Sequence, residues 1–192
     1  MVIRDEVYFS VDVEADGPIP GPYSMISFGV AVAGRRGETF ITADPTAQTF
    51  YRELRPISDE FVPAALEVSG LDRAHLTNHG TPPEQAMREL VEWIGEVCGD
   101  GRPVMVAYPA SFDWMFLYWY LIRFTGGSPF GHSGCLDMKT MYAVRAGVPL
   151  RQAVKKLMPR ELLSTRRHTH HALDDAVEQA DLFVNLMRWA GP

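Results

Sequence analysis

An Asp-x-Glu pair, Asp12 and Glu14, ends an alternating stretch of β-branched and aromatic residues at positions 7–13, VYFSVDV. Such alternation predicts a β-strand, in which side chains two residues apart point to the same face. Asp12 and Glu14 therefore share one face, opposite the apolar one. Paired carboxylates repel each other unless a cation lies between them, and such oxygen ligands suit Mg²⁺ or Mn²⁺. On this pair alone, polar residues at the fraying end of a strand are the better explanation.

A third acid, Asp113, precedes the apolar and aromatic stretch WMFLYWYLI at 114–122, and no other acid lies between Gly101 and Leu136. A helix that is apolar on every side is usually buried. The helix dipole favours a carboxylate at the N-terminal end, so helix capping and metal binding explain Asp113 equally well. The aromatic rings are chemically able to stack on bases, but we expect most of them in the core.

The last segment, residues 172–190, has the spacing of an amphipathic helix. One stripe is polar and should face water; it contains Asp174, Glu178, Asp181, Asn185 and Arg188. Asp175 lies on the other side, beside Leu182 and Leu186. An acid on the packed side of a helix needs a partner or a metal. We therefore expect Asp174 on the surface and Asp175 in a functional site.

Three histidines, His168, His170 and His171, stand just before this helix. Histidine is the usual general base near neutral pH, and a base on a loop can approach a substrate. A surface tract that binds zinc, or no function at all, explains three nearby histidines equally well. The residue types alone do not separate these three explanations.

The remaining pattern predicts an α/β domain with a mixed sheet. A strand meander comes first, and helices and strands then alternate. The expected strands are residues 7–13, 25–33, 38–43, 103–107 and 135–136, and the expected helices are residues 61–68, 83–97, 112–124, 138–146 and 172–190. Because no repeat or long linker divides the chain, residues 1–192 are expected to form a single domain.

Three motifs now stand in order along nearly the whole chain: Asp12-x-Glu14, Ser-Phe-Asp113, and His170 followed five residues later by Asp175. Together they resemble the DEDDh exonucleases, which include ribonuclease T, oligoribonuclease and the proofreading subunit of the bacterial replicative polymerase. The family spacing selects His170, because His171 has an alanine at the same offset. The resemblance implies a ribonuclease H-like fold, with a mixed, mostly five-stranded sheet flanked by helices.

The resemblance also implies an activity, a metal-dependent 3′→5′ exonuclease that acts on single-stranded RNA or DNA and releases nucleoside 5′-monophosphates. Four carboxylates would hold two Mg²⁺ or Mn²⁺ ions, and His170 would be the general base; the carboxylates are Asp12, Glu14, Asp113 and Asp175. Weaker candidates for substrate contacts are Ala15, Met25, Phe112, Arg166 and Arg167. The second motif departs from the family pattern, because Pro109 stands where an asparagine is usual.

Composition sets wider bounds. The net charge is −6, yet residues 151–167 carry +5, which fits either a phosphate-binding site or, preferably, a solvated helix face. Cys98 and Cys135 are expected to be reduced thiols. Without an apolar run of about 20 residues or a signal peptide, a cytoplasmic protein is expected, and a homodimer is compatible with the resemblance. The competing functions are a catalytically inactive nucleic-acid-binding module and a hydrolase of short oligonucleotides.

Overall fold

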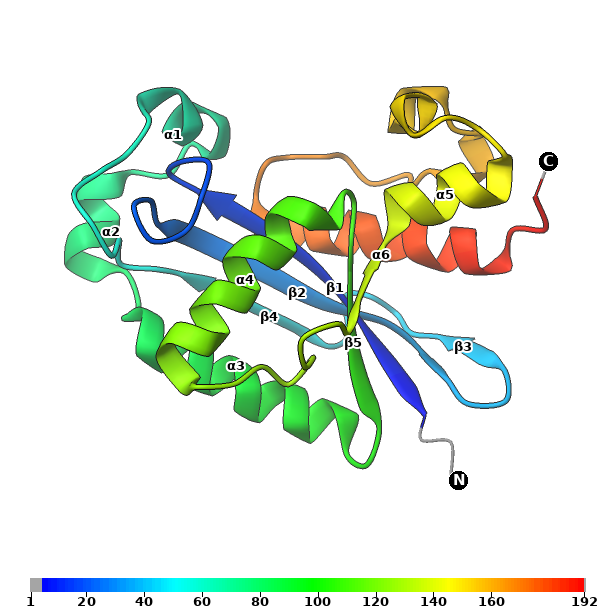
Figure 1. Cartoon of the computed structure of the whole chain (residues 1–192), viewed down its shortest axis with the longest axis horizontal. Helices are drawn as coiled ribbons and strands as arrows, with labels where there is room; N and C mark the ends of the chain where they lie inside the picture. The colour runs from blue at the N-terminus through cyan, green and yellow to red at the C-terminus, as the bar shows by residue number, and fades with distance from the viewer. Residues whose placement is uncertain (1–4, 192) are drawn as a thin grey trace.

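Six strands form one mixed sheet in the computed structural model, which describes residues 5–191 (Figure 1). The spatial order is β3-β2-β1-β5-β6, and β4 pairs with the other half of β2. β1 and β2 are antiparallel, whereas β5 and β6 run parallel to β1. The strands are β1 Glu6–Ala15, β2 Met25–Arg36, β3 Phe40–Thr42, β4 Thr49–Glu53, β5 Arg102–Ala107 and β6 Cys135–Asp137.

Helices cover both faces of this sheet, so that two hydrophobic cores form, one on each side. α3 and α4 pack on one face, and α5 and α6 pack on the other (Figure 1). The helices are α1 Pro63–Ser69, α2 Arg73–His79, α3 Pro83–Cys98, α4 Ala110–Thr125, α5 Met138–Ala146 and α6 Ala172–Arg188. Three short 3-10 turns, Leu150–Gln152, Lys155–Leu157 and Arg160–Leu162, lie between α5 and α6.

β1 lies in the middle of the sheet and supplies both cores. Its odd-numbered residues, such as Val7 and Phe9, enter the core under α3 and α4, whereas Tyr8 enters the core under α6. The alternation of side chains along a strand therefore places Asp12 and Glu14 on the α6 side. The predicted sharing of a face by these two acids is confirmed.

The approach of α6 to the sheet depends on Gly29 in β2. Gly29 is the cross-strand partner of Asp12, and a Cβ atom at this position would come within 2.4 Å of the backbone of Leu173. Because there is no side chain between them, the first turn of α6 lies directly on β2. This contact brings the N-terminal end of α6 next to the carboxyl end of β1.

Most expected elements are present, including the antiparallel meander of β1, β2 and β3, but three expectations need correction. β4 and α2 were not predicted. The basic stretch 151–167 is not a helix, because it forms 3-10 turns separated by extended residues. No helix within residues 5–191 has the length and apolar character needed to cross a bilayer.

The third correction concerns the polar stripe on α6, where Glu178 was expected to face water. Glu178 is only 5% exposed and forms an ion pair with Lys155. The segment with the 3-10 turns folds over this side of α6 and supplies partners to two other residues of the stripe: Arg166 pairs with Asp181, and the Leu162 carbonyl accepts from Asn185. A tertiary contact has therefore covered a face that the helical pattern assigned to solvent.

Candidate active site

Asp12 and Glu14 lie at the carboxyl end of β1, and the side-chain amide of Gln179 orients Asp12. Gln179 Nε2 of α6 donates a hydrogen bond to Asp12 Oδ1 (2.7 Å). The Gln179 Oε1 atom accepts a hydrogen bond from the backbone N–H of Tyr108, just after β5 (2.7 Å). Gln179 is almost fully buried, and these two hydrogen bonds connect β1, the end of β5 and α6 through one side chain.

Asp175 in the first turn of α6 is completely buried, whereas its neighbour Asp174 is exposed. This difference confirms that Asp174 lies on the exposed side of the helix and Asp175 on the packed side, as the helical phase predicted. The two carboxylate oxygens of Asp175 accept hydrogen bonds from the backbone N–H groups of Thr169 and His170, each at 2.8 Å. The loop before α6 is therefore wrapped around this carboxylate. His170 itself has a φ of 60°, a left-handed conformation that is uncommon for residues other than glycine.

Asp113 lies in the first turn of α4 but does not cap the helix. The N-cap residue is Pro109, which follows a cis peptide bond. Instead, Asp113 Oδ1 accepts a hydrogen bond from the backbone N–H of Val13, which lies between Asp12 and Glu14 (3.0 Å). The capping explanation is therefore wrong, and this buried carboxylate ties α4 to the acidic end of β1.

The electrostatics of this cluster favour a bound cation. Burial, followed by repulsion from Asp113, Glu14 and Asp175, raises the pKa of Asp12 well above its usual range. Burial and the nearby Asp175 raise the pKa of Glu14 to about 7. Burial likewise raises the pKa of Asp113 to about 7, against the opposing effect of the Val13 hydrogen bond. Burial is the largest cause of each shift and repulsion from neighbouring carboxylates adds to it, so a bound cation would favour the ionised forms.

The donor atoms fit a divalent metal ion. Carboxylate oxygens of Asp12, Glu14 and Asp175 all lie within 4.8 Å of one another. Mg²⁺ and Mn²⁺ prefer hard oxygen ligands, and the three acids come from two elements that the packing of α6 on Gly29 holds together. Asp113 lies outside this group of three, but its charge is the strongest ionic influence on the pKa of Asp12.

The histidines separate into two kinds. His170 and His168 are exposed, their rings lie 4.5 Å apart, and both lie beside Asp175. His171 instead places its ring against Tyr51 of β4, with centroids 4.6 Å apart. The structure therefore brings His170 to the carboxylate cluster and turns His171 toward an aromatic side chain.

The five candidate substrate contacts occupy different surroundings. Ala15 and Phe112 line an apolar cavity of about 500 Å³ together with Glu14, and Phe112 is 36% exposed. Met25 is completely buried in the core, which leaves it unavailable to a base and corrects that expectation.

Arg166 and Arg167 line a separate cavity of about 340 Å³ beside Leu173 and Asp174, and Arg166 is paired with Asp181 at 3.0 Å. The two arginines therefore lie beside the acids Asp174 and Asp181, and they do not line the cavity of Ala15 and Phe112.

Two residues near the cluster were given no role by the sequence. Gln179 lies one helical turn after Asp175, so the same helical phase that singled out Asp175 was a usable signal. Lys155 lies in a 3-10 turn, pairs with Glu178, and its positive charge lowers the pKa of Asp12. Nothing in the local sequence predicts that a turn residue would reach α6.

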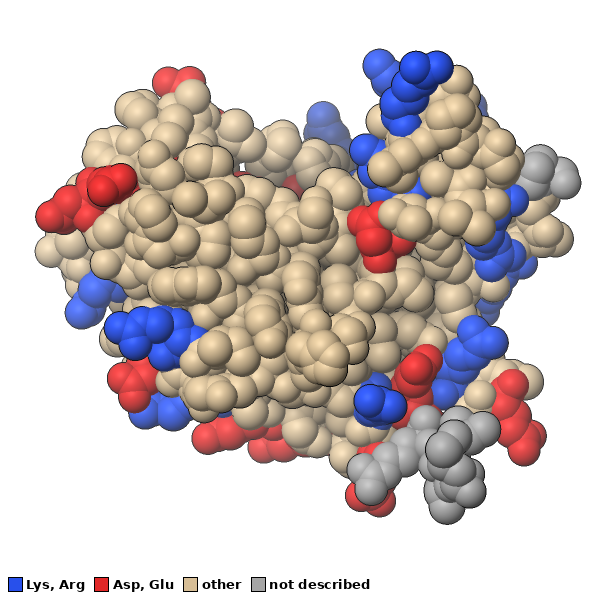
Figure 2. Space-filling view, in the orientation of Figure 1, with Lys and Arg blue, Asp and Glu red and all other residues tan. Residues whose placement is uncertain are grey.

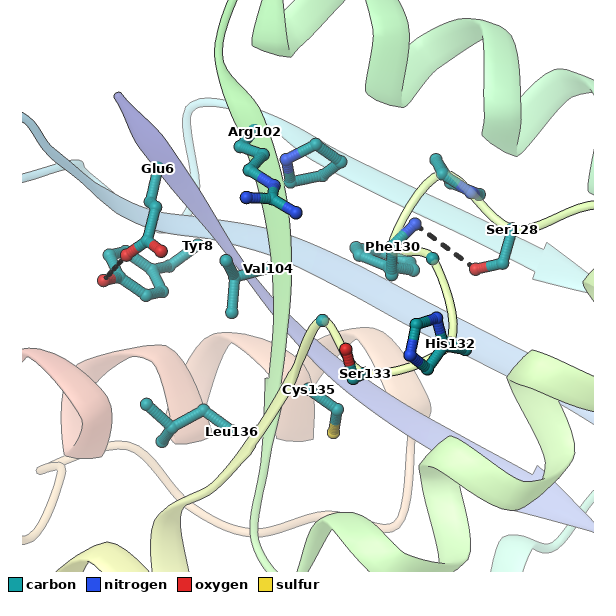
Figure 3. A pocket seen from close by; sticks show the side chains of 14 residues that line it. Glu6, Tyr8, Arg102, Val104, Ser128, Phe130, His132, Ser133, Cys135 and Leu136 are labelled. Carbon is teal, nitrogen blue, oxygen red and sulfur yellow. Dashed lines mark hydrogen bonds between the residues drawn. The ribbon is translucent and has the colours of Figure 1, made fainter. Parts of the chain in front are cut away.

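The opposite end of β1 opens into a larger cavity of about 600 Å³, between β5 and the loop before β6 (Figure 3). Glu6 lies there and accepts a hydrogen bond from the Tyr8 hydroxyl (2.6 Å), Arg102 lies beside it on β5, and His132 lies in the loop before β6. Among the described residues that line this cavity, Glu6 is the only acid. The two ends of one strand therefore have different chemistry, and the larger cavity is not the acidic site.

Residues 9–183 match the family model RNase_T, which describes exonucleases. The 3′-5′ DNA exonuclease Cap18 of Escherichia coli is 39% identical over 179 residues, which cover 93% of this chain and 90% of that protein.

Solved structures share the fold. The nuclease domain of 3′hExo, a DEDDh family member bound to rAMP, has a TM-score of 0.69 at 15% identity, over 96% of this chain and 92% of that one. A 3′-exonuclease solved for its recognition of a histone mRNA stem-loop has a TM-score of 0.71 at 15% identity, over 96% of this chain and 64% of that one. The chain therefore belongs to the RNase_T family of exonucleases, as a 3′-5′ exonuclease.

Proposed function

We propose that this exonuclease removes nucleotides one at a time from the 3′ end of single-stranded DNA, with two Mg²⁺ or Mn²⁺ ions in the acidic site. The observation that carries the proposal is the convergence of Asp12, Glu14 and Asp175 within 4.8 Å, with His170 alongside. The choice of DNA is supported by the relative at 39% identity, which is a DNA exonuclease.

The proposed roles follow from the surroundings of each side chain. Asp12, Glu14, Asp175 and Asp113 would hold the ions, which supply charge stabilisation to both oxygens of an in-line displacement at phosphorus. His170 would accept the proton of the attacking water, since its exposed ring stands on the loop that the Asp175 carboxylate anchors. Gln179 would keep Asp12 oriented through its hydrogen bond to Oδ1.

The substrate strand has two surfaces to contact. The apolar cavity lined by Ala15 and Phe112 adjoins Glu14 and suits the sugar and base of the last nucleotide. Basic side chains gather over the segment with the 3-10 turns, which includes Arg151, Lys156 and Arg160 (Figure 2). These exposed cations suit the phosphates of the strand that leads into the site. The acidic remainder of the protein disfavours a long duplex, so a single-stranded end is the better substrate.

The direct test compares matched single strands of DNA and RNA, each labelled at the 3′ or the 5′ end. We expect Mg²⁺-dependent release of labelled nucleoside 5′-monophosphate from 3′-labelled DNA, loss of activity in EDTA, and recovery with Mn²⁺. Faster hydrolysis of RNA than of DNA would overturn the choice of substrate. A rate on a dinucleotide that exceeds the rate on a 20-mer of the same sequence would favour the hydrolase of short oligonucleotides instead.

A further inference from the structure

We infer that Asp175 also belongs to a second metal site, formed with His168 and His170, which takes Zn²⁺ and inhibits the exonuclease. The inference rests on the proposed roles of Asp175 and His170. It assigns a function to His168, which neither the family motifs nor the proposed mechanism uses. It also chooses among the explanations that three closely spaced histidines allowed.

The geometry suits a small tetrahedral ion. His168 Nδ1 lies 3.1 Å from Asp175 Oδ1. Zinc bonds of about 2.0–2.1 Å to nitrogen and oxygen separate neighbouring ligand atoms in a tetrahedron by about 3.3 Å. One ligand pair therefore already has nearly the required spacing. The third ligand atom, from His170, lies within 4.8 Å of both others, and its ring is exposed.

The donor atoms differ from those of the carboxylate cluster. Two imidazoles and one carboxylate form a nitrogen-rich set, which suits Zn²⁺ much better than Mg²⁺. The set of Asp12, Glu14 and Asp175 contains oxygen alone and suits Mg²⁺ or Mn²⁺. Asp175 thus lies between two groups of ligands with different metal preferences. Because His168 and His170 are exposed, water has access to the fourth coordination position.

Zinc in this position would act on the proposed reaction through two residues. An imidazole nitrogen of His170 that binds Zn²⁺ is no longer available to accept a proton. The Asp175 carboxylate would be shared with the ion on the histidine side, which weakens its hold on the ions of the acidic cluster. Both effects predict inhibition by Zn²⁺ when Mg²⁺ is in excess.

A simpler role for His168 is a hydrogen bond that orients Asp175, and the two roles make different predictions. An orienting hydrogen bond does not depend on zinc. His171 offers a matched control, because it lies in the same loop, is equally exposed, and turns its ring toward Tyr51 instead of Asp175.

The test uses the whole protein, with His168→Asn as the variant and His171→Asn as the control. Zn²⁺ binding is measured by calorimetry with ZnCl₂ in the absence of nucleic acid, and circular dichroism checks the fold. We expect wild type and His171→Asn to bind Zn²⁺ with the same affinity, and His168→Asn to bind at least roughly tenfold more weakly. Equal Zn²⁺ affinity in all three proteins would overturn the inference.

A second measurement connects binding to inhibition. The Mg²⁺-supported rate on a 3′-labelled oligonucleotide is recorded while Zn²⁺ is added. With each rate expressed relative to the same protein without Zn²⁺, His168→Asn should need at least tenfold more Zn²⁺ for half inhibition than wild type. An unchanged half-inhibiting concentration would contradict the inhibitory role and point to the carboxylate cluster instead. Because calorimetry does not require turnover, a protein without exonuclease activity would still show whether the zinc site exists.

Discussion

Asp175 and Glu178 are buried acids three residues apart on α6, yet their surroundings have opposite character. Asp175 faces the other carboxylates at the end of β1, and the N–H groups of Thr169 and His170 donate to it. Glu178 faces the segment with the 3-10 turns, where Lys155 neutralises it. One helix therefore carries an acid that adds to a concentration of negative charge and an acid whose charge is already balanced.

The contrast teaches that burial of an acid does not identify a functional site; the identity of its neighbours does. A buried acid in an ion pair, such as Glu178 with Lys155, helps to hold a neighbouring segment against the helix. Removal of one partner of the pair therefore lowers the free energy of unfolding. A buried acid beside other acids raises the free energy of the metal-free site through charge repulsion. A bound cation compensates that repulsion. Substitutions on the two sides of α6 should therefore separate activity from stability.

The largest expected effect is loss of activity in Asp175→Asn. The change keeps the shape of the side chain but removes a proposed ligand, so the rate should fall by at least about 10²–10³-fold, as when one transition-state contact is removed. Glu178→Gln should keep a rate within the same order of magnitude. Rates on a 3′-labelled oligonucleotide, with Asp174→Asn as the exposed control, decide this. Equal losses in the variants of Asp175 and Glu178 would contradict the distinction.

A smaller effect on activity is expected from Gln179→Leu, which removes the hydrogen bond to Asp12 without removing a carboxylate. Partners that orient a metal ligand typically contribute 10–100-fold to metal affinity, so roughly that much more Mg²⁺ should be needed for half-maximal rate. Asn185→Ala, also on α6, is the control because its partner is the Leu162 carbonyl. A loss of rate that saturating Mg²⁺ does not recover would show that Gln179 does more than orient Asp12.

The neutralised side should respond in stability instead. Lys155→Met leaves Glu178 buried without its partner, and breaking such a pair costs roughly 3 kcal/mol of unfolding free energy. Arg88→Met is the control, since its ion pair with Glu84 is exposed and should contribute less than about 1 kcal/mol. Urea unfolding near neutral pH gives both values. Recovery of stability in the double variant Lys155→Met/Glu178→Leu is expected, and its absence would mean that Lys155 stabilises the fold through other contacts.

The smallest expected effect is a dependence of metal-free stability on pH. In the folded protein Glu14 and Asp113 each have a pKa of about 7, whereas their usual pKa values are 4.5 and 3.8. Between these limits the folded state binds more protons than the unfolded state, so stability should fall as the pH rises. The melting temperature in EDTA should be lower at pH 8 than at pH 5.5, and Mg²⁺ or Glu14→Gln should reduce the difference. A melting temperature that rises over this range in EDTA would contradict the assigned pKa shifts.

Sequence patterns predicted the acidic residues of the site better than the residues that contact and orient them. The phase of a long amphipathic helix distinguished Asp175 from Asp174, because that phase does not depend on distant contacts. The same argument was wrong for Glu178, because the distant Lys155 covers it. Gln179 has the right phase, but an amide gains significance only when its partners, Asp12 and the Tyr108 N–H, are known.

The missed elements have weak local signals. β4 is five residues long with a mixed sequence, TFYRE, and it exists through pairing with β2. α2 buries a single residue, Leu76, so it has no apolar stripe to detect. Its clearest local signal is Asp72, whose carboxylate accepts from two backbone N–H groups at the helix start. Short elements of this kind are defined by tertiary contacts and caps, which a search for hydrophobic periodicity does not see.

Gly29 shows how a residue without reactive atoms can set the dimensions of a reactive site. At Gly29, the cross-strand partner of Asp12, β2 and α6 are so close that a methyl group would meet the backbone of Leu173. Any larger side chain would act as a spacer and widen the gap between the carboxylates. A redesign of this enzyme for other metals or substrates would therefore begin with Gly29, although this residue has no acidic or basic side chain.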